Sequence, residues 1–338
     1  MPFAWNRIKR ARICQFMRRF PLIAIGVAAV AGLAVLAQET TLKVQVDLVT
    51  LLCSVREKKG GRLVGNLNKE DFTVLEDGKE QTVKYFTRET DLPLTIGLLV
   101  DVSASQGNLI GVEQDAGGQF FKQVLRPKDL AFLIDFGPDA EVLQDFTNSY
   151  KLLRAGLDKL RVTSDPSGAG QLPGPVPTMS HPKGTILYDA VYLAASEQLK
   201  NQVGRKALVL ITDGVDQGSH YKIEQAIEAA QRNDVIIYSV CYVDYAFYRG
   251  RFVSTSDSAL KRMSDETGGH EFRVDRKQTL QQIFDELNQE LRTQYSLAYT
   301  PTNPTANGGF RKIEIRTSNK DLKVQTRKGY YATSTGPQ

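Results

Sequence analysis

Three continuous apolar runs constrain the fold of this 338-residue chain more than any other feature of its sequence. They are residues 94–100 (LTIGLLV), 207–212 (ALVLIT) and 235–243 (VIIYSVCYV). Apolar runs without polar alternation are typical of strands that are buried on both faces of a sheet. Helical patterns alternate with these runs, and the strongest of them covers residues 185–202. The alternation predicts βαβ units, and therefore an α/β fold with a doubly wound, mostly parallel sheet covered by helices on both faces.

The rest of this region, residues 92–293, follows the same alternation. Further strands are expected at 130–136, 141–146 and 271–274, and further helices at 113–125, 150–160, 223–233, 258–266 and 280–293. One long stretch rich in glycine and proline, residues 163–184, interrupts the pattern. Because structureless loops of this length are uncommon in compact domains unless they are functional or mobile, we expect this loop to shape the specificity of a nearby site.

Shorter strand patterns occupy two flanks, residues 42–90 and 294–334. The expected strands are 42–55, 72–75, 81–87, 295–299, 311–317 and 322–327. Turn signals at Lys59-Gly60-Gly61 and Glu76-Asp77-Gly78 separate the strands of the first flank. Each flank alone is too small for a stable sheet. We therefore expect the two flanks to pack together into one β-sandwich-like unit, with the α/β domain inserted between them.

The N-terminal 37 residues have the layout of a secretory signal peptide. A basic stretch precedes an uncharged apolar run at 20–37, which ends in Val35-Leu36-Ala37 before the polar Gln38-Glu39. The run is also long enough to span a bilayer, so an uncleaved N-terminal anchor is the alternative. Both interpretations place the body of the protein outside the cytoplasm, because the basic residues that precede an apolar membrane segment stay on the cytoplasmic side. We therefore expect an exported protein of the periplasm, the cell envelope or the secreted fraction.

The net positive charge of the chain comes from residues 1–37, which we call the leader. The formal net charge is +5, but residues 1–37 hold six basic residues and no acid, which leaves 37 basic against 38 acidic residues in the body. A body that is close to neutral gives no electrostatic reason to expect nucleic-acid binding. Only Cys53 and Cys241 follow the leader, both in apolar runs, and we interpret them as two buried thiols rather than as a disulfide.

Five oxygen-bearing side chains converge on one edge of the predicted sheet. Asp101, Ser103 and Ser105 directly follow the apolar run at 94–100, and Asp213 directly follows the run at 207–212. Thr185 begins the strong helix after the long loop. Ligands of open parallel sheets collect outside the carboxyl ends of the strands, so these residues lie where a site is expected.

The chemistry of these five side chains favours a hard divalent cation. Carboxylate and hydroxyl oxygens suit magnesium, manganese or calcium, and the absence of thiolate and imidazole from the set disfavours zinc and copper. Two carboxylates offset the charge of a dication, while neutral hydroxyls fill coordination positions without adding repulsion. Such a site can hold Mg²⁺, or Mn²⁺ or Ca²⁺, and still leave one vertex open to an outside ligand.

The motif Asp-x-Ser-x-Ser after an apolar strand, with a downstream threonine and a later strand that ends in Thr-Asp-Gly, resembles a von Willebrand factor type A domain. The resemblance covers about residues 92–293 and includes the metal-ion-dependent adhesion site (MIDAS) of that family. In the family, two serines and a threonine coordinate the ion, two aspartates hold it directly or through water, and a carboxylate of a partner protein takes the open vertex. The resemblance implies these roles for Ser103, Ser105, Thr185, Asp101 and Asp213.

The flanks resemble a narrower group, the VWFA-related acidobacterial domain family. The residues that carry this resemblance are the stretches 65–72 (GNLNKEDF), 76–78 (EDG), 294–299 (QYSLAY) and 328–331 (KGYY). Function in that group is mostly unassigned, so the resemblance informs the fold more than the role.

Several other polar residues have structural interpretations that we prefer. Asp189 is expected on the face of its helix rather than as a ligand, and Asp135 is expected to be structural, although it ends an apolar strand. Asp216 and Gln217 fit a loop as well as an outer shell of the metal site. The three histidines (His181, His220 and His270) are expected to be loop residues, because no pair has the i, i+4 spacing of a zinc site.

Three functions are consistent with the sequence. The first is a non-enzymatic, exported binding module that engages an acidic side chain of a protein partner through a bound cation. The second is a metal-assisted hydrolase such as a phosphatase, for which Lys183 is the only nearby lysine. The third is a scaffold for envelope assembly in which the metal only stiffens the loops. We favour the first, because a metal-assisted hydrolase usually needs a general acid, base or lysine held at the metal, and Lys183 lies on the long loop. A serine nucleophile is also not indicated, because neither serine lies in a Gly-x-Ser-x-Gly motif.

Overall fold

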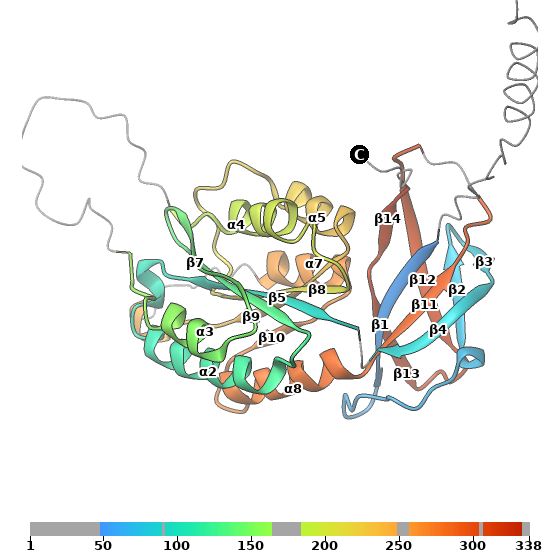
Figure 1. Cartoon of the computed structure of the whole chain (residues 1–338), viewed down its shortest axis with the longest axis horizontal. Coiled ribbons are helices and arrows are strands. Elements are labelled where there is room, and N and C mark those ends of the chain that lie inside the picture. The colour runs from blue at the N-terminus through green and yellow to red at the C-terminus, as the bar shows by residue number, and fades with distance from the viewer. Residues whose placement is uncertain (1–47, 90–91, 164–183, 249–256, 304–306, 333–338) are drawn as a thin grey trace, which may run out of the picture. The chain divides into compact units, whose positions relative to one another are not determined.

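A six-stranded sheet forms the centre of the α/β region in the computed structural model, which describes residues 48–89, 92–163, 184–248, 257–303 and 307–332 (Figure 1). The strand order is β10-β9-β8-β5-β6-β7. The strands are β5 (Leu94–Asp101), β6 (Leu130–Phe136), β7 (Ala140–Thr147), β8 (Arg205–Thr212), β9 (Val235–Cys241) and β10 (Glu271–Arg273). All neighbours pair in parallel except β7, which forms an antiparallel pair with β6. The predicted fold class is confirmed.

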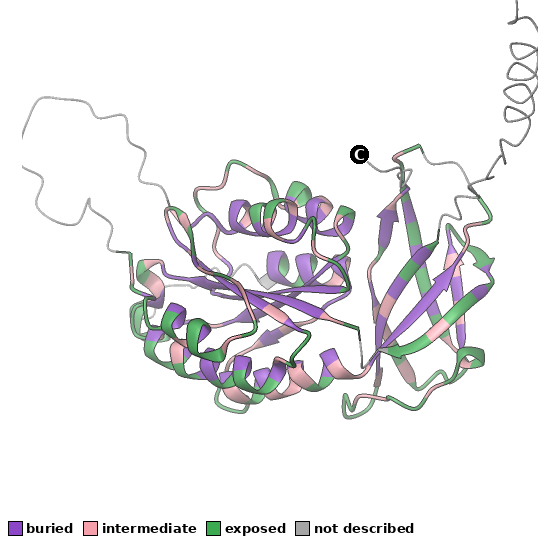
Figure 2. Cartoon of the chain, viewed as in Figure 1, coloured by how far each residue is buried: buried purple, intermediate pink, exposed green. Residues whose placement is uncertain are grey.

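The three apolar runs become the most deeply buried strands. Every residue of β5, β8 and β9 is buried, as the purple ribbons in the centre of the sheet indicate (Figure 2). Gly97 in β5 is part of this packing, because a Cβ at this position would lie only 2.2 Å from Cζ of Phe132. The sheet is therefore the rigid element from which the polar loops at its edge project.

Helices cover both faces of the sheet (Figure 1). One face packs against α2 (Ile110–Val124), α3 (Tyr150–Leu157) and α8 (Leu280–Arg292), and the other against α4 (Leu187–Leu193), α5 (Ile223–Arg232) and α7 (Asp257–Thr267). The helix expected at 185–202 is shorter than predicted, because α4 passes into a π-helical turn, Ala194–Gln198, at its end. The two apolar cores lie between these helices and the sheet.

The two flanks form two four-stranded sheets with the orders β13-β1-β11-β4 and β14-β12-β2-β3. The strands are β1 (Val49–Glu57), β2 (Phe72–Glu76), β3 (Lys79–Gln81), β4 (Val83–Glu89), β11 (Gln294–Tyr299), β12 (Phe310–Thr317), β13 (Leu322–Thr326) and β14 (Gly329–Tyr331). Each sheet contains strands from both flanks, and one apolar core joins the two sheets. The expected sandwich built from both flanks is therefore present.

The hairpin between β2 and β3 differs from the sequence prediction in one respect. Asp77 and Gly78 have φ angles of 48° and 80°, as a two-residue hairpin turn requires, and Glu76 pairs with Lys79 in the ladder. Glu76 is thus a buried strand residue and not part of the turn. The turn needs only two residues, so the strand continues one residue further than the turn signal indicates.

Some features of the sequence fall outside the described residues. The apolar run at 20–37 and most of the loop at 163–184 are among them. No helix within the described part of the chain is both long enough and apolar enough to cross a membrane. Cys53 and Cys241 are both free and buried, as predicted.

Candidate metal centre

The carboxyl ends of β5 and β8 bring the two predicted aspartates to the same edge of the sheet. The strands are parallel neighbours, and Val100 pairs with Ile211 in the ladder. The residues that follow this pair are Asp101, the last residue of β5, and Thr212, after which Asp213 begins a loop. Both aspartates are buried, since one ends and the other directly follows a strand that is buried on both faces.

Four of the five predicted ligands form a continuous chain of hydrogen bonds. The backbone N–H of Ser103 donates to Oδ1 of Asp101 at 2.9 Å, and the hydroxyl oxygens of Ser103 and Ser105 lie 3.0 Å apart. The hydroxyl of Ser105 donates to Oδ2 of Asp213 at 2.8 Å. Asp213, which lies 108 residues from Ser105 along the chain, thus converges with the 101–105 segment on one small volume. The two carboxylates lie at the ends of the hydrogen-bonded chain and the two hydroxyl groups between them.

The carboxylates form the floor of this volume and the hydroxyl groups its rim. Asp101 and Asp213 are buried, whereas Ser103 and Ser105 are partly exposed to solvent. Thr212 supports the floor, because its hydroxyl donates to Oδ2 of Asp101 at 2.6 Å. A cation held by this set would therefore have protein oxygens below it and solvent on its open side.

Burial raises the pKa of Asp101 to about 7, although the hydrogen bonds from Thr212 and Ser103 lower it. The negative charge of the nearby Asp213 also raises this pKa. A carboxyl group in this environment gains from a neighbouring positive charge, since a bound dication stabilises its ionised form. The electrostatics of the floor thus favour a cation.

Thr185 lies beside the loop that follows β8. Its backbone carbonyl accepts hydrogen bonds from the N–H groups of Gln217 (3.0 Å) and Gly218 (3.2 Å), and the residue is buried. Within the described residues, no hydrogen bond joins its hydroxyl to Asp101, Ser103, Ser105 or Asp213. The structure therefore brings four of the five predicted ligands together by direct contact, and it ties the fifth to the same loop through its backbone.

Asp189 and Asp216 stabilise the loop that follows β8. Asp189 accepts the backbone N–H groups of His220 and Tyr221 and also contacts Nδ1 of His220 at 2.9 Å. Burial alone raises the pKa of Asp189, but these hydrogen bonds lower it below its ordinary value. Asp216 accepts from the hydroxyl of Ser219 and the N–H of Tyr188. Both carboxylates thus hold loop 213–222 against the start of α4.

The sequence analysis missed one residue that contacts the site directly. The hydroxyl of Tyr248, in the short helix α6 (Tyr245–Tyr248), donates to Oδ2 of Asp213 at 2.7 Å. Burial and this contact raise the pKa of the Tyr248 hydroxyl. A signal for this residue was available, because α6 follows β9, whose carboxyl end lies at the same edge of the sheet.

Two further polar residues near the site are unexpectedly buried. Glu113 in α2 and Gln106 in the turn after Ser105 are both inaccessible to solvent. Their side chains have no hydrogen-bond partner within the described part of the chain. The sequence analysis did not single them out, although Glu113 lies on the same face of α2 as the apolar Ile110 and Ala116.

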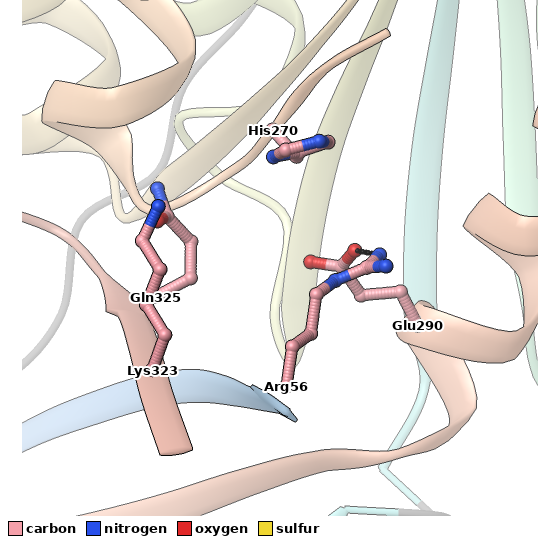
Figure 3. Close-up of a pocket in the computed structure, with 5 residues that line it drawn as sticks. All are labelled: Arg56, His270, Glu290, Lys323 and Gln325. Carbon is pink, nitrogen blue, oxygen red and sulfur yellow. Dashed lines mark hydrogen bonds and ion pairs between the residues drawn. The ribbon is translucent and has the colours of Figure 1, made fainter. Parts of the chain in front are cut away.

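A second group of charged and neutral polar side chains lies where the sandwich contacts α8 (Figure 3). They line a small pocket, and they are Arg56, His270, Glu290, Lys323 and Gln325. Arg56 forms ion pairs with Glu290 and, at 2.5 Å, with Glu286, while the hydroxyl of Ser54 donates to Glu290 at 2.9 Å. Because these charges neutralise each other, the group fastens β1 to α8 and does not form an open site.

The other histidine and lysine candidates add no catalytic group to the metal centre. His181 and Lys183 lie outside the described residues. His220 contacts Asp189, and His270 belongs to the group shown in Figure 3. Among the described residues there is no cluster of three or more histidine, cysteine or acidic side chains that could hold a metal ion. Any cation at the sheet edge would therefore depend on the hydroxyl groups.

Comparisons with known proteins concern the same region. The family model of the von Willebrand factor type A domain matches residues 178–286, a range that includes Thr185 and Asp213. An uncharacterized protein of Borreliella burgdorferi is 25% identical over 248 residues, which are 67% of this chain and 62% of that protein. The chain thus spans less than two thirds of the length of this relative.

Solved structures with a similar fold include type A proteins. A von Willebrand factor type A structure from Catenulispora acidiphila has a TM-score of 0.47 and 10% identity, and the match covers 80% of this chain and 76% of that one. Proximal thread matrix protein 1 from the mussel byssus, solved with a zinc-occupied MIDAS motif, has a TM-score of 0.48 and 14% identity over 64% of this chain and 50% of that one. The family match confirms the resemblance to type A domains, which are generally protein-interaction modules and often hold a metal at a MIDAS.

Proposed function

We propose that the von Willebrand factor type A domain of this chain is a metal-dependent protein-binding module of an exported protein. Its divalent cation is held by Asp101, Ser103, Ser105, Thr185 and Asp213. A carboxylate of the partner protein binds the open vertex of the cation. The single observation that carries this proposal is the hydrogen-bonded chain from Asp101 through both serines to Asp213.

The donor set fits a hard dication and its partner. The ligand atoms are all oxygens, two of them from buried carboxylates that offset the charge of the ion. The serine hydroxyls at the rim are partly exposed, which leaves the solvent side of the site accessible. A carboxylate from another protein is the ligand of opposite charge that this open side favours. Mg²⁺ is the expected ion, with Mn²⁺ or Ca²⁺ as substitutes.

Exposed aromatic side chains beside the site support protein binding. Tyr248 contacts Asp213 and thereby fixes α6 at the edge of the metal centre. In the same helix, Tyr245 is 61% exposed and Phe247 is 49% exposed. Aromatic residues are enriched in protein interfaces, where they contribute a large share of the binding energy. We expect these two rings to contact the partner around its acidic residue.

Isothermal titration of the purified full-length chain with Mg²⁺ and Mn²⁺ tests the metal site. We expect the wild type to bind one ion, and Asp213→Ala to lose affinity by about a hundredfold or more, since metal-site carboxylates and even their supporting groups have effects of this order. Asp115→Ala is the matched control, because Asp115 is an exposed aspartate of α2 that forms an ion pair with Arg154 and lies outside the proposed ligand set. No heat of binding at millimolar metal would reject the proposed site.

Affinity capture from an envelope extract, with and without a chelator, tests the partner. A partner that is retained by the wild type, and is lost both with chelator and with Asp213→Ala, supports the adhesive role. Retention that survives the chelator, combined with a metal-dependent rise in melting temperature, supports the scaffold instead. Hydrolysis of a generic phosphate ester that is lost in Asp213→Ala would support the hydrolase.

A further inference from the structure

A buried carboxyl group without a partner lies directly behind the proposed metal centre. Glu113, in the first turn of α2, has an exposed fraction of 0%. Neither of its carboxyl oxygens has a hydrogen-bond partner among the described residues. Buried acidic groups are normally paired, because taking a charged group out of water is costly. Glu113 therefore calls for an explanation that packing alone does not supply.

Backbone hydrogen bonds connect Glu113 to the serine segment of the site. The N–H of Glu113 donates to the carbonyl of Leu109 at 3.0 Å, and the N–H of Leu109 donates to the carbonyl of Gln106, the residue after Ser105. Burial raises the pKa of Glu113 well above its ordinary value, and the charge of Asp101, at the end of β5, raises it further. Burial also raises the pKa of Tyr242, which follows β9, and the charge of Glu113 adds to that shift. β8 lies between β5 and β9, and its end leads to Asp213. Glu113 thus lies on the α2 side of the point where the three central strands end.

A second orphaned polar side chain belongs to the same segment. Gln106 follows Ser105, has an exposed fraction of 0%, and neither atom of its carboxamide group has a partner within the described residues. Its backbone is well anchored, because its N–H donates to the carbonyl of Ser103 at 2.9 Å and its carbonyl accepts from Leu109 at 2.8 Å. The surrounding residues, such as Val102 and Ile110, form an apolar core in which an apolar side chain would be the stable choice.

We propose that Glu113 and Gln106 form a polar inner layer of the metal centre that supports the hydrated cation from below. This inference rests on the proposed function. Hard dications such as Mg²⁺ keep several bound waters, and those waters need hydrogen-bond acceptors and donors within the protein. Glu113 supplies the acceptors and Gln106 supplies both kinds of group. Both side chains destabilise the metal-free protein. When the cation is bound, its waters become their hydrogen-bond partners.

Glu113 is a positioning residue in this account and not a direct ligand. No hydrogen bond within the described residues joins it to Asp101, Ser103, Ser105 or Asp213, so it acts through water and through the field at Asp101. Burial raises the pKa of Glu113, and a bound dication would favour its ionised form, which adds a third carboxylate to those of Asp101 and Asp213. We therefore expect the inner layer to increase affinity for the cation while it lowers the stability of the metal-free fold.

The test compares metal affinity and metal-free stability in the purified full-length chain. Glu113→Gln keeps the shape of the side chain and removes its charge. We expect its affinity for Mg²⁺, measured by calorimetric titration, to fall about tenfold, as is typical when an outer-shell partner of a metal site is removed. Its melting temperature in chelator should equal or exceed that of the wild type, because the carboxamide is as unpartnered as the carboxyl group it replaces but cannot acquire a buried charge. A purely structural role would instead lower the melting temperature and leave the metal affinity unchanged.

A second variant keeps the inference testable if Glu113→Gln does not fold. Gln106→Met replaces the carboxamide with an apolar side chain of similar length, which suits the surrounding core. We expect it to melt at a higher temperature in chelator and to bind Mg²⁺ several-fold more weakly. Asp115→Asn and Gln119→Met are matched controls on exposed positions of α2, and both should bind as the wild type does.

The outcomes separate this inference from the proposed function. If the wild type binds neither Mg²⁺ nor Mn²⁺, the proposed metal centre itself fails. If the wild type binds and either inner-layer variant retains the wild-type affinity, the proposed metal centre stands and the inner layer is rejected. Loss of affinity in both variants without loss of metal-free stability supports the inner layer.

Discussion

Two buried glutamates, one in the sandwich and one in the α/β region, differ sharply in their surroundings. Glu76, at the end of β2, accepts hydrogen bonds from Arg311 (2.8 Å), Tyr299 (2.6 Å) and Tyr330 (2.9 Å). Glu113, in α2, has no partner within the described residues. Both are almost inaccessible to solvent, so burial alone does not distinguish them. The difference lies in whether the protein itself satisfies the carboxylate.

This difference separates structural from functional burial. The partners of Glu76 come from β11, β12 and β14, so one carboxylate connects strands of both flanks and both sheets. A fully hydrogen-bonded buried group makes a fold specific. A group left without partners costs stability, and such costs concentrate at sites that bind something. We therefore interpret the sandwich as the support and the sheet edge as the working part.

Truncating the partnered glutamate should have the largest effect. Glu76→Ala leaves Arg311 and two tyrosine hydroxyls buried without their acceptor, and breaking such a buried pair costs about 3–5 kcal/mol. Urea denaturation of the metal-free protein measures this loss. Metal affinity at low temperature should be unchanged, because the site lies in the other region. A loss below about 1 kcal/mol would show that the Glu76 cluster is not a structural centre.

The second effect concerns the metal centre alone. Mg²⁺ at a hundred times its dissociation constant should stabilise the folded chain by about 2.7 kcal/mol relative to chelator, since it binds only the folded state. Glu76→Ala should keep this increment, and Asp213→Ala should lose it. Thermal melts of all three proteins in Mg²⁺ and in chelator provide the comparison. If Mg²⁺ stabilises all three proteins equally, the cation does not bind at Asp213.

The sandwich and the sheet edge also differ in how much the sequence reveals. The alternation of the stretch 311–317 (RKIEIRT) and the apolar runs predict their strands correctly, because burial on one or both faces leaves a direct trace in the order of residues. The convergence of Asp101 and Asp213 is predictable for the same reason, since both end buried parallel strands. Patterns in the local sequence are sufficient for this prediction, because the carboxyl ends of neighbouring parallel strands lie at the same edge of the sheet.

Contacts across the fold are not predictable in this way. The buried role of Glu76 is hidden, because the sequence shows it beside an Asp-Gly turn and its three partners lie more than 220 residues away. The position of Tyr248 after β9 indicates the shared edge of the sheet, but nothing in its local pattern identifies Asp213 as its partner. Glu113 left a trace, since it interrupts the apolar face of α2, but one polar residue in a helix is usually solvated. Its burial depends on the packing of α2 against the sheet.

A half-buried carboxyl group tests whether the burial of carboxylates destabilises the α/β region. Asp135, in β6, has its pKa raised to about 6 by burial and by the charge of Glu141. Because the folded state holds this proton more tightly than the unfolded state, the contribution of Asp135 to stability is complete below about pH 4 and is lost as the pH rises through about 6. Asp135→Asn, which stays neutral, should therefore exceed the wild type in stability by about 1 kcal/mol at pH 8, after allowance for solvent screening of a half-buried group.

Melting temperatures in chelator between pH 4 and pH 8 measure this effect. The advantage of Asp135→Asn should grow with pH across the interval and vanish near pH 4. If the difference in melting temperature between Asp135→Asn and the wild type does not change with pH, it arises from the shape of the side chain and not from its charge. In that case Asp135 would give no support to the idea that burial of a carboxylate destabilises the α/β region.

The smallest expected effects compare one chemical change in the two regions. Tyr330→Phe removes one hydrogen bond to Glu76, and Tyr248→Phe removes one to Asp213. We expect the first to cost about 1 kcal/mol, because water cannot reach Glu76 to replace the lost donor. The second should cost about half as much, because Tyr248 is only partly buried and its removal admits water to a carboxylate that still accepts from Ser105. Urea denaturation of both variants in chelator resolves this difference, and equal costs would mean that access to water does not distinguish the sandwich from the sheet edge.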